Sequence, residues 1–160
     1  MRRFLYISPF FPPMTRVGAL RPLKFARHLP DNGWAPVVLC DLRPEDEVDA
    51  RLEQALPDST IVIRDYGPKA AHARGRPSAP SAPSAPSAPQ RPRKPGWFAR
   101  HGEDLNPLGA HVFTIGHALR AARAALRAHR DCEAIMVNAD PYAAMIVGAR
   151  LARETGLPLI

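Results

Sequence analysis

Two short segments of this 160-residue chain hold the residue types that bind or stabilise a charged ligand. The first contains Arg16, Gly18 and Arg21, and it follows the apolar run at residues 4–8. Glycine allows close approach of the backbone, a following helix N-terminus attracts anions, and the arginines add positive charge. These properties predict a site for phosphate or another anion. The alternative interpretation is an ordinary strand-to-helix connection with solvated arginines.

The second segment contains Asn138, Asp140 and Tyr142, and it follows the apolar run at residues 134–137. An open α/β sheet presents its ligand-binding groups directly after its strands, at their carboxyl ends. Asp140 is therefore a candidate catalytic carboxylate. The alternative is structural, because aspartate is a preferred helix N-cap and a helix is expected to start near Tyr142.

Alternating strands and helices must position both segments. We expect strands at residues 4–8, 36–40, 60–64 and 134–137, and the beginning of a fifth at 157–160. Helices are expected from about residue 19, from about residue 44, near 115–126 and at 142–155. In the clearest of them, apolar residues recur at spacings of four, three and four. This alternation predicts an α/β, Rossmann-like parallel sheet with helices on both faces.

A low-complexity insertion interrupts this single domain, which we assign to residues 1–160 with an incomplete C-terminus. Four Ser-Ala-Pro repeats occupy residues 78–89. Proline at every third position favours extended chain that buries no core, so we expect a flexible Pro/Ala/Ser-rich insertion at residues 67–95. The segment between Asp65 and Glu103 has seven basic residues and no acidic residue. The rest of the chain has the other 15 of the 22 basic residues and all 15 acidic residues, so its charges balance. The formal charge of +7 thus belongs to this segment, which argues against a nucleic-acid-binding domain.

Missing patterns exclude several common chemistries. The chain lacks the dinucleotide-binding motif G-x-G-x-x-G, although Asp41 follows the second strand, where such a fold has its ribose-binding acid. It also lacks the phosphate-binding P-loop motif G-x-x-x-x-G-K-[ST] and the nucleophile-elbow motif G-x-S-x-G. None of the six histidines has zinc-site spacing, so no metal is expected. Cys40 and Cys132 are expected to be free core residues of a reduced compartment.

No apolar run reaches the roughly 18 residues of a membrane span, and the run after the basic N-terminus is too short for a signal peptide. We therefore expect a cytoplasmic protein. Peripheral contact with the membrane is a further expectation, because arginines recur at helical spacing and could dock on anionic lipid; a merely solvated face is the alternative. These arginines are Arg120, Arg123, Arg127 and Arg130.

Two stretches resemble a known family. The sequence FLYISPFFPPMTRVGALRPLKFARHLPDNGWAPVVLC (residues 4–40) resembles the beginning of bacterial family 4 glycosyltransferases, which have the GT-B fold. The sequence EAIMVNADPYAAMIVGARLARETGLPLI (residues 133–160) is similar to that family's fourth strand, Pro-Tyr turn, helix and G-x-P before the fifth strand. The resemblance implies the acceptor-side N-terminal domain of a retaining hexosyltransferase in polysaccharide or glycolipid biosynthesis.

The resemblance also assigns roles to residues. It places Gly18 near the donor phosphates, Arg21 in the same cleft, and Asn138, Asp140 and Tyr142 close to the reacting sugar or acceptor. The nucleotide-sugar is a co-substrate, so no resident cofactor is expected, and the other partner is a glycan or lipid-linked acceptor. Many relatives have a histidine in the fourth-strand turn, which this sequence lacks. The family's nucleotide-sugar-binding C-terminal domain has no counterpart here, so the chain alone is expected to be inactive.

Two other functions remain open. One is a non-catalytic α/β module whose basic, proline-rich segment recruits a partner such as a proline-recognising domain. The other is a nucleotide-binding α/β protein of a different kind.

Overall fold

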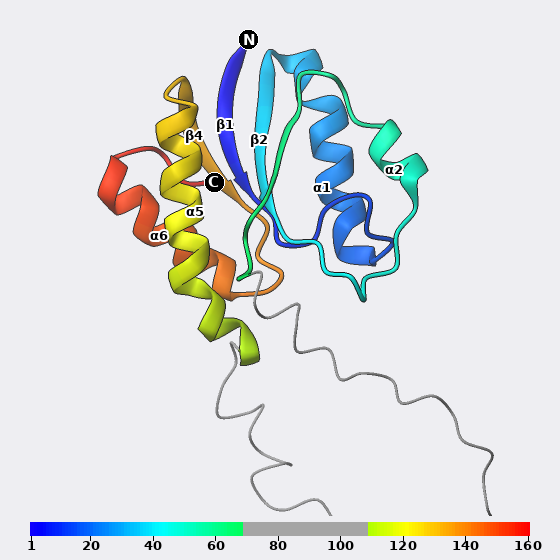
Figure 1. The fold of residues 1–160 in the computed structure, drawn as a ribbon. Helices are drawn as coiled ribbons and strands as arrows, with labels where there is room; N and C mark the ends of the chain where they lie inside the picture. Colours follow the sequence, from blue (N-terminus) through cyan, green and yellow to red (C-terminus); the bar gives the residue numbers. More distant parts are fainter. Residues whose placement is uncertain (69–108) are drawn as a thin grey trace, which may run out of the picture.

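The computed structural model describes residues 1–68 and 109–160, and Figure 1 shows one sheet between two layers of helices. Four strands pair in parallel in the order β3–β2–β1–β4. They are β1 (Arg2–Ile7), β2 (Trp34–Cys40), β3 (Ile61–Arg64) and β4 (Cys132–Val137). The predicted Rossmann-like fold is confirmed. The expected insertion at residues 67–95 lies outside the described residues, apart from its first two positions.

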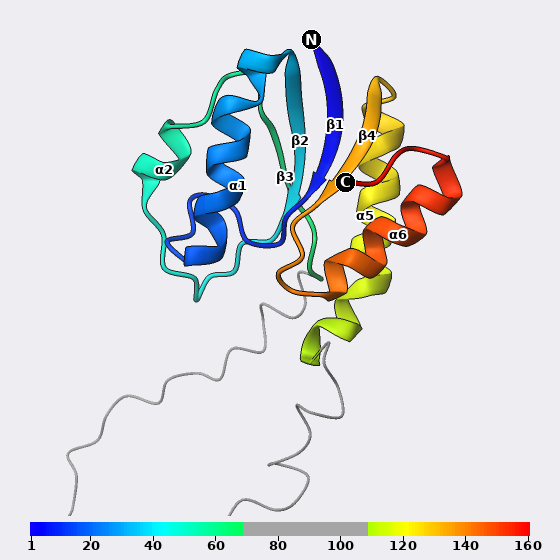
Figure 2. The ribbon, with the colours of Figure 1, turned by 180° about the vertical axis from the view of Figure 1, so that it is seen from behind.

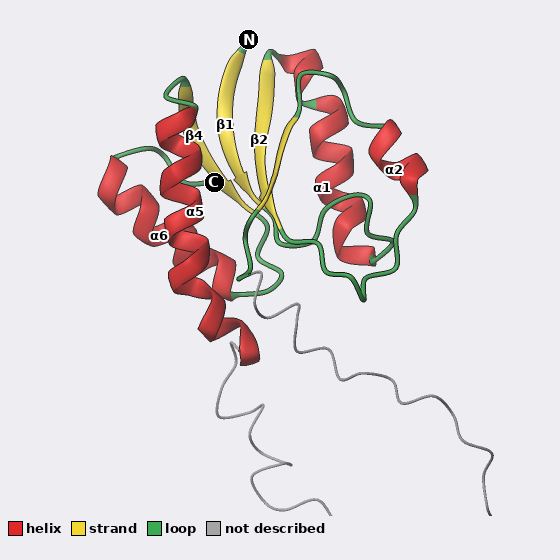
Figure 3. Cartoon of the chain, in the orientation of Figure 1, coloured by secondary structure: helices red, strands yellow, loops and turns green. Residues whose placement is uncertain are grey.

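Helices cover both faces of the sheet, as the opposite views of Figure 1 and Figure 2 show. Helices α1 (Val17–His28) and α2 (Ala50–Gln54) lie on one side, and α5 (Ile115–Ala128) and α6 (Ala143–Thr155) lie on the other (Figure 3). Two short 3-10 helices, η1 (Pro30–Asn32) and η2 (Gly109–Thr114), complete the described elements. Among the described residues, no helix is long and apolar enough to cross a bilayer.

The central strands are buried on both faces, as expected of a parallel sheet with two helical layers. Leu5 and Ile7 of β1 face the cluster that α5 and α6 cover, whereas Phe4 and Tyr6 face the cluster on the side of α1. Cys40 belongs to the second cluster, and both described cysteines are free and buried, as predicted.

The expected helix from residue 44 is wrong in its start. Helix α2 begins only at Ala50, where the side chain of Asp49 accepts a hydrogen bond from the Arg51 amide (2.9 Å). The preceding residues instead pair with the loop after β1: Met14 forms an antiparallel bridge with Val48. This long-range pairing satisfies backbone groups that a helix would otherwise have used.

The chain returns beside β4 after α6, as predicted for a fifth strand. Leu159 forms a parallel bridge with Ile135, and the Ile135 amide donates to the Pro158 carbonyl (2.9 Å). The strand order places β2 and β3 on one side of β1, and β4 with this last segment on the other. The loops after β1 and β4 therefore diverge at a topological switch point, where open α/β sheets bind ligands.

Candidate functional site

A cavity of about 500 Å³ opens at the switch point, between residues 17–24 of α1 and the loop after β4. We call it the switch-point cleft. It brings together four of the six residues that the sequence singled out: Gly18, Arg21, Asn138 and Asp140. Its other lining residues are Val17, Leu20 and Lys24.

Gly18 lies close to the opposite wall of the cleft. It is the second residue of α1, and a Cβ atom built on it would lie 3.3 Å from Asp140 Oδ2 and 3.1 Å from Phe10 Cδ2. The first turn of α1 has no acidic residue, and its N-cap Arg16 makes no side-chain cap. Asp140 therefore supplies a carboxylate beside the positive end of this helix.

Asn138 ties the loop after β4 to the loop after β1. Its backbone amide donates to the Ile7 carbonyl (2.9 Å), and its Nδ2 donates to Ser8 Oγ (3.4 Å). The fully buried Ser8 hydroxyl donates in turn to the Phe10 carbonyl (2.8 Å). These bonds hold the two walls of the cleft in register across the sheet edge.

The structure does not bear out the alternative role of Asp140 as a helix cap. Helix α6 begins at Ala143, and its N-cap is Tyr142, without a side-chain cap. The side chain of Asp140 is exposed and makes no hydrogen bond or ion pair in the described part of the chain. Its carboxylate is therefore available to a ligand.

Two predicted site residues lie elsewhere. Arg16 turns away from the cleft: its guanidinium pairs with Asp46 (3.2 Å) and lies 5.4 Å from the Phe10 ring centre. The Asp46 side chain is only 4% exposed, and a buried carboxylate needs such a partner. Tyr142 is 64% exposed and does not line the cleft.

Sequence reasoning missed Lys24, which lies beside Arg21 along the wall that α1 contributes. Val17, Leu20 and Lys24 follow one another at three- to four-residue spacing, so helical periodicity could have placed them on one face with Arg21. Two cations and the single carboxylate of Asp140 give the cleft a net positive lining.

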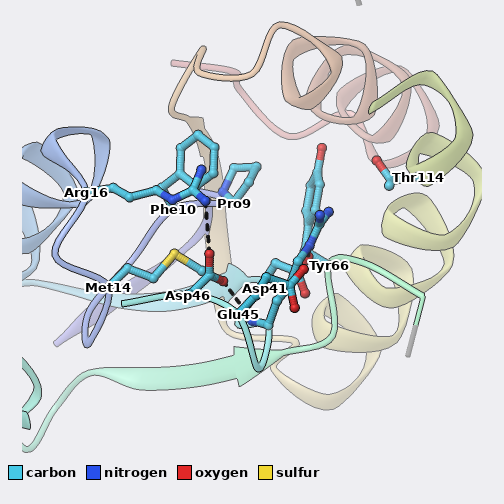
Figure 4. Close-up of a pocket in the computed structure, with 10 residues that line it drawn as sticks. Pro9, Phe10, Met14, Arg16, Asp41, Glu45, Asp46, Tyr66 and Thr114 are labelled. Carbon is cyan, nitrogen blue, oxygen red and sulfur yellow. Dashed lines mark hydrogen bonds and ion pairs between the residues drawn. The ribbon is translucent and has the colours of Figure 1, made fainter. Parts of the chain in front are cut away.

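A second, smaller cavity of about 160 Å³ lies on the other side of the loop formed by residues 8–16, which we call the proline loop. Figure 4 shows Phe10, Met14 and Arg16 of the proline loop beside Asp46 of the loop after β2, with Tyr66 on the opposite side. We call it the proline-loop pocket. Its lining residues are Pro9, Phe10, Met14, Arg16, Asp41, Arg43, Glu45, Asp46, Tyr66 and Thr114.

Tyr66 and Asp41 give this pocket buried polar groups. Burial raises the pKa of Tyr66 to about 12, with a smaller contribution from nearby Asp41, so the phenol stays protonated at neutral pH. The Asp41 carboxylate accepts from the Leu42 amide (3.1 Å) and from Arg43 Nε (3.2 Å). Asp41 thus directly follows β2, as the sequence suggested, but its hydrogen bonds join it to the proline-loop pocket and not to the switch-point cleft.

The described residues hold no cluster of three or more histidine, cysteine or acidic side chains that could bind a metal. Within the part of the chain that the structure describes, His117 pairs with Asp65 at 3.4 Å. Comparison with known protein families, curated proteins and solved structures gives no match for this chain.

Proposed function

We propose that this chain is the acceptor-side domain of a glycosyltransferase that transfers a sugar from a nucleotide-sugar to a glycan or lipid-linked acceptor. The supporting observation is the convergence of Gly18, Arg21, Asn138 and Asp140 on one cleft at the switch point. These residues come from distant segments, and each belongs to one of the two stretches that resemble family 4 glycosyltransferases.

The charges of the cleft support transfer from a diphosphate leaving group. Arg21, Lys24 and the N-terminus of α1 offer positive charge where negative charge grows as the sugar departs. Asp140 lies across the cleft and has no protein partner among the described residues. In this proposal its carboxylate stabilises the positive charge of an oxocarbenium-like transition state.

The rim of the cleft favours an acceptor with an apolar portion. Val17 is 85% exposed and Leu20 is 42% exposed, although both are large aliphatic side chains at the cavity. A lipid-linked acceptor has an apolar chain next to an anionic phosphate. These two parts match the apolar side chains and the neighbouring cations of the cleft.

The test is a transfer assay on the full-length gene product with a panel of labelled nucleotide-sugars and lipid-linked acceptors. Arg21→Gln and Asp140→Asn are each expected to lower kcat/KM by roughly 10- to 100-fold, because each removes charge stabilisation of the transition state. Arg27→Gln is the matched control, since Arg27 is exposed on the same helix but does not line the cleft.

Two results would overturn the proposal. One is the absence of transfer or donor hydrolysis with every nucleotide-sugar in the panel. The other is unchanged kcat/KM in both cleft variants. Tight binding of a dinucleotide in the same cleft would instead favour a nucleotide-binding protein of another kind.

A further inference from the structure

The proline-loop pocket is separate from the switch-point cleft. The two cavities share no lining residue, and the proline loop lies between them. Nothing in the proposed transfer reaction uses Asp41, Arg43 or Tyr66. The pocket therefore needs an explanation of its own.

Backbone hydrogen bonds fix the walls of this pocket in place. The Asp41 amide donates to the Pro9 carbonyl (3.0 Å), which joins the base of the proline loop to the end of β2. Further along, the Asp49 amide donates to the Pro13 carbonyl (2.8 Å), and the Thr15 amide donates to the Glu47 carbonyl (3.1 Å). Because these walls are already ordered, binding of a ligand here would cost little conformational entropy of the protein.

Both arginines of the pocket and two of its three carboxylates, those of Asp41 and Asp46, are already paired with one another. Asp46 accepts from the Arg43 amide (2.8 Å) and pairs with the Arg16 guanidinium, while Asp41 pairs with Arg43 Nε. The lining contains three acids and two arginines, so a phosphate would meet more negative than positive charge. At Asp41 and Asp46, a cationic ligand would have to compete with the arginines that these carboxylates already hold. The third acid, Glu45, is exposed to solvent, which weakens any ion pair that it forms.

Neutral hydroxyl groups avoid both penalties. A hydroxyl donates to the remaining lone pairs of a paired carboxylate and accepts from unused guanidinium N–H groups, so no ion pair has to break. Two neighbouring hydroxyls on one ring can do both at once.

The remaining walls suit the apolar side of such a ring. The side chains of Pro9 and Phe10 lie across the pocket from the ring of Tyr66, as Figure 4 shows. Tyr66 is 2% exposed, and its hydroxyl has no hydrogen-bond partner among the described residues, although the nearby Thr114 hydroxyl acts to lower its pKa. A volume of about 160 Å³ corresponds to about five water molecules at ~30 Å³ each, which is room for one small ring.

We propose that the proline-loop pocket binds one ring of a neutral polyhydroxylated ligand, of the sugar or cyclitol class. Vicinal hydroxyls would bond to Asp41 and Arg43, and the C–H face of the ring would lie between Phe10 and Tyr66. The buried Tyr66 hydroxyl would donate to a further oxygen of the ligand. This inference does not depend on glycosyl transfer, because it concerns binding at a different cavity.

The test is a titration of the ¹⁵N-labelled chain with D-ribose, D-glucose and myo-inositol, followed by amide chemical shifts. Inorganic phosphate and ethanolamine serve as charged probes. The expected result is saturable shifts at millimolar polyol for the amides of Phe10, Leu42 and Tyr66, with the amides of Gly18 and Asn138 unmoved. The tighter-binding probe then distinguishes a sugar from a cyclitol.

Variants separate a binding role from a structural one. Tyr66→Phe keeps the ring and removes one hydroxyl, so it is expected to weaken polyol binding about threefold to tenfold; Asp41→Asn is expected to weaken it at least about tenfold. Glu47→Gln is the matched control, since it changes the same loop outside the pocket lining. If Asp41→Asn unfolds the chain, Tyr66→Phe decides alone.

Three results would overturn the inference. These are the absence of saturable shifts with all three polyols, saturable shifts only with phosphate or ethanolamine, and polyol-induced shifts at the cleft amides rather than the pocket amides. None of them depends on whether the full-length protein transfers sugar.

Discussion

Replacing Gly18 with alanine tests the close contact between the two walls of the cleft, and the chain offers a matched control. Gly18 is the second residue of α1, and Gly116 is the second residue of α5. A Cβ on Gly116 would meet nothing within 4 Å, whereas one on Gly18 would lie 3.1 Å from Phe10 and 3.3 Å from Asp140. The two substitutions therefore share a helix position and differ in their surroundings.

The expected stabilities follow from two opposing terms. Alanine is more favourable than glycine in a helix, so Gly116→Ala is expected to raise the free energy of unfolding by about 0.5–1 kcal/mol. At Gly18 the same gain is offset, because the Phe10 ring and the Asp140 carboxylate must each move by a few tenths of an ångström. Arg16 lies over that ring and resists its movement, so we assign the shift a cost of about 1 kcal/mol. Gly18→Ala should then leave stability nearly unchanged.

Urea unfolding of both variants, followed by circular dichroism, measures this difference. The transfer assay measures the second consequence, because the new methyl group displaces Asp140 from its place beside α1. We expect kcat/KM to fall roughly tenfold in Gly18→Ala and to stay unchanged in Gly116→Ala.

Either of two results would refute this reasoning. Equal stabilisation of the two variants would mean that the contact at Gly18 is not tight. A loss of stability in Gly18→Ala with full activity would mean that the contact between Gly18 and Asp140 is only structural.

Two further predictions concern the core. In Gly148→Ala the added Cβ would lie 2.3 Å from Val137 Cγ2, so we expect the free energy of unfolding to fall by about 2 kcal/mol or more in urea titrations; an unchanged midpoint would contradict this packing. Burial raises the pKa of Cys40 from 9.0 to about 12, so the thiol ionises first in the unfolded chain and stability is lost as pH rises above about 9. Urea curves at pH 7, 9 and 10 should show about 1.4 kcal/mol of this loss at pH 10, and Cys40→Ala should remove that part; an identical pH dependence in the variant would contradict the prediction.

Much of the fold could be predicted from local pattern. Apolar runs and helical spacing placed all four strands within two residues of their observed starts, and they also indicated the segment beside β4. The prediction of a helix from residue 44 was wrong because residues 47–49 pair with the proline loop. A local sequence pattern does not indicate such pairing with a segment that is distant in sequence. The acidic residues there suit a helix start, but long-range pairing decided otherwise.

The sequence by itself determined which loops carry ligand-binding chemistry, because polar residues that follow buried strands must emerge at one edge of a parallel sheet. Only the tertiary structure decided which side chains share a cavity. It placed Lys24 in the switch-point cleft with Gly18 and Asp140, and it directed the Arg16 side chain into the proline-loop pocket instead. The physical reason is that a buried carboxylate, Asp46, requires a cationic partner, and its position depends on how the loops after β1 and β2 pack together.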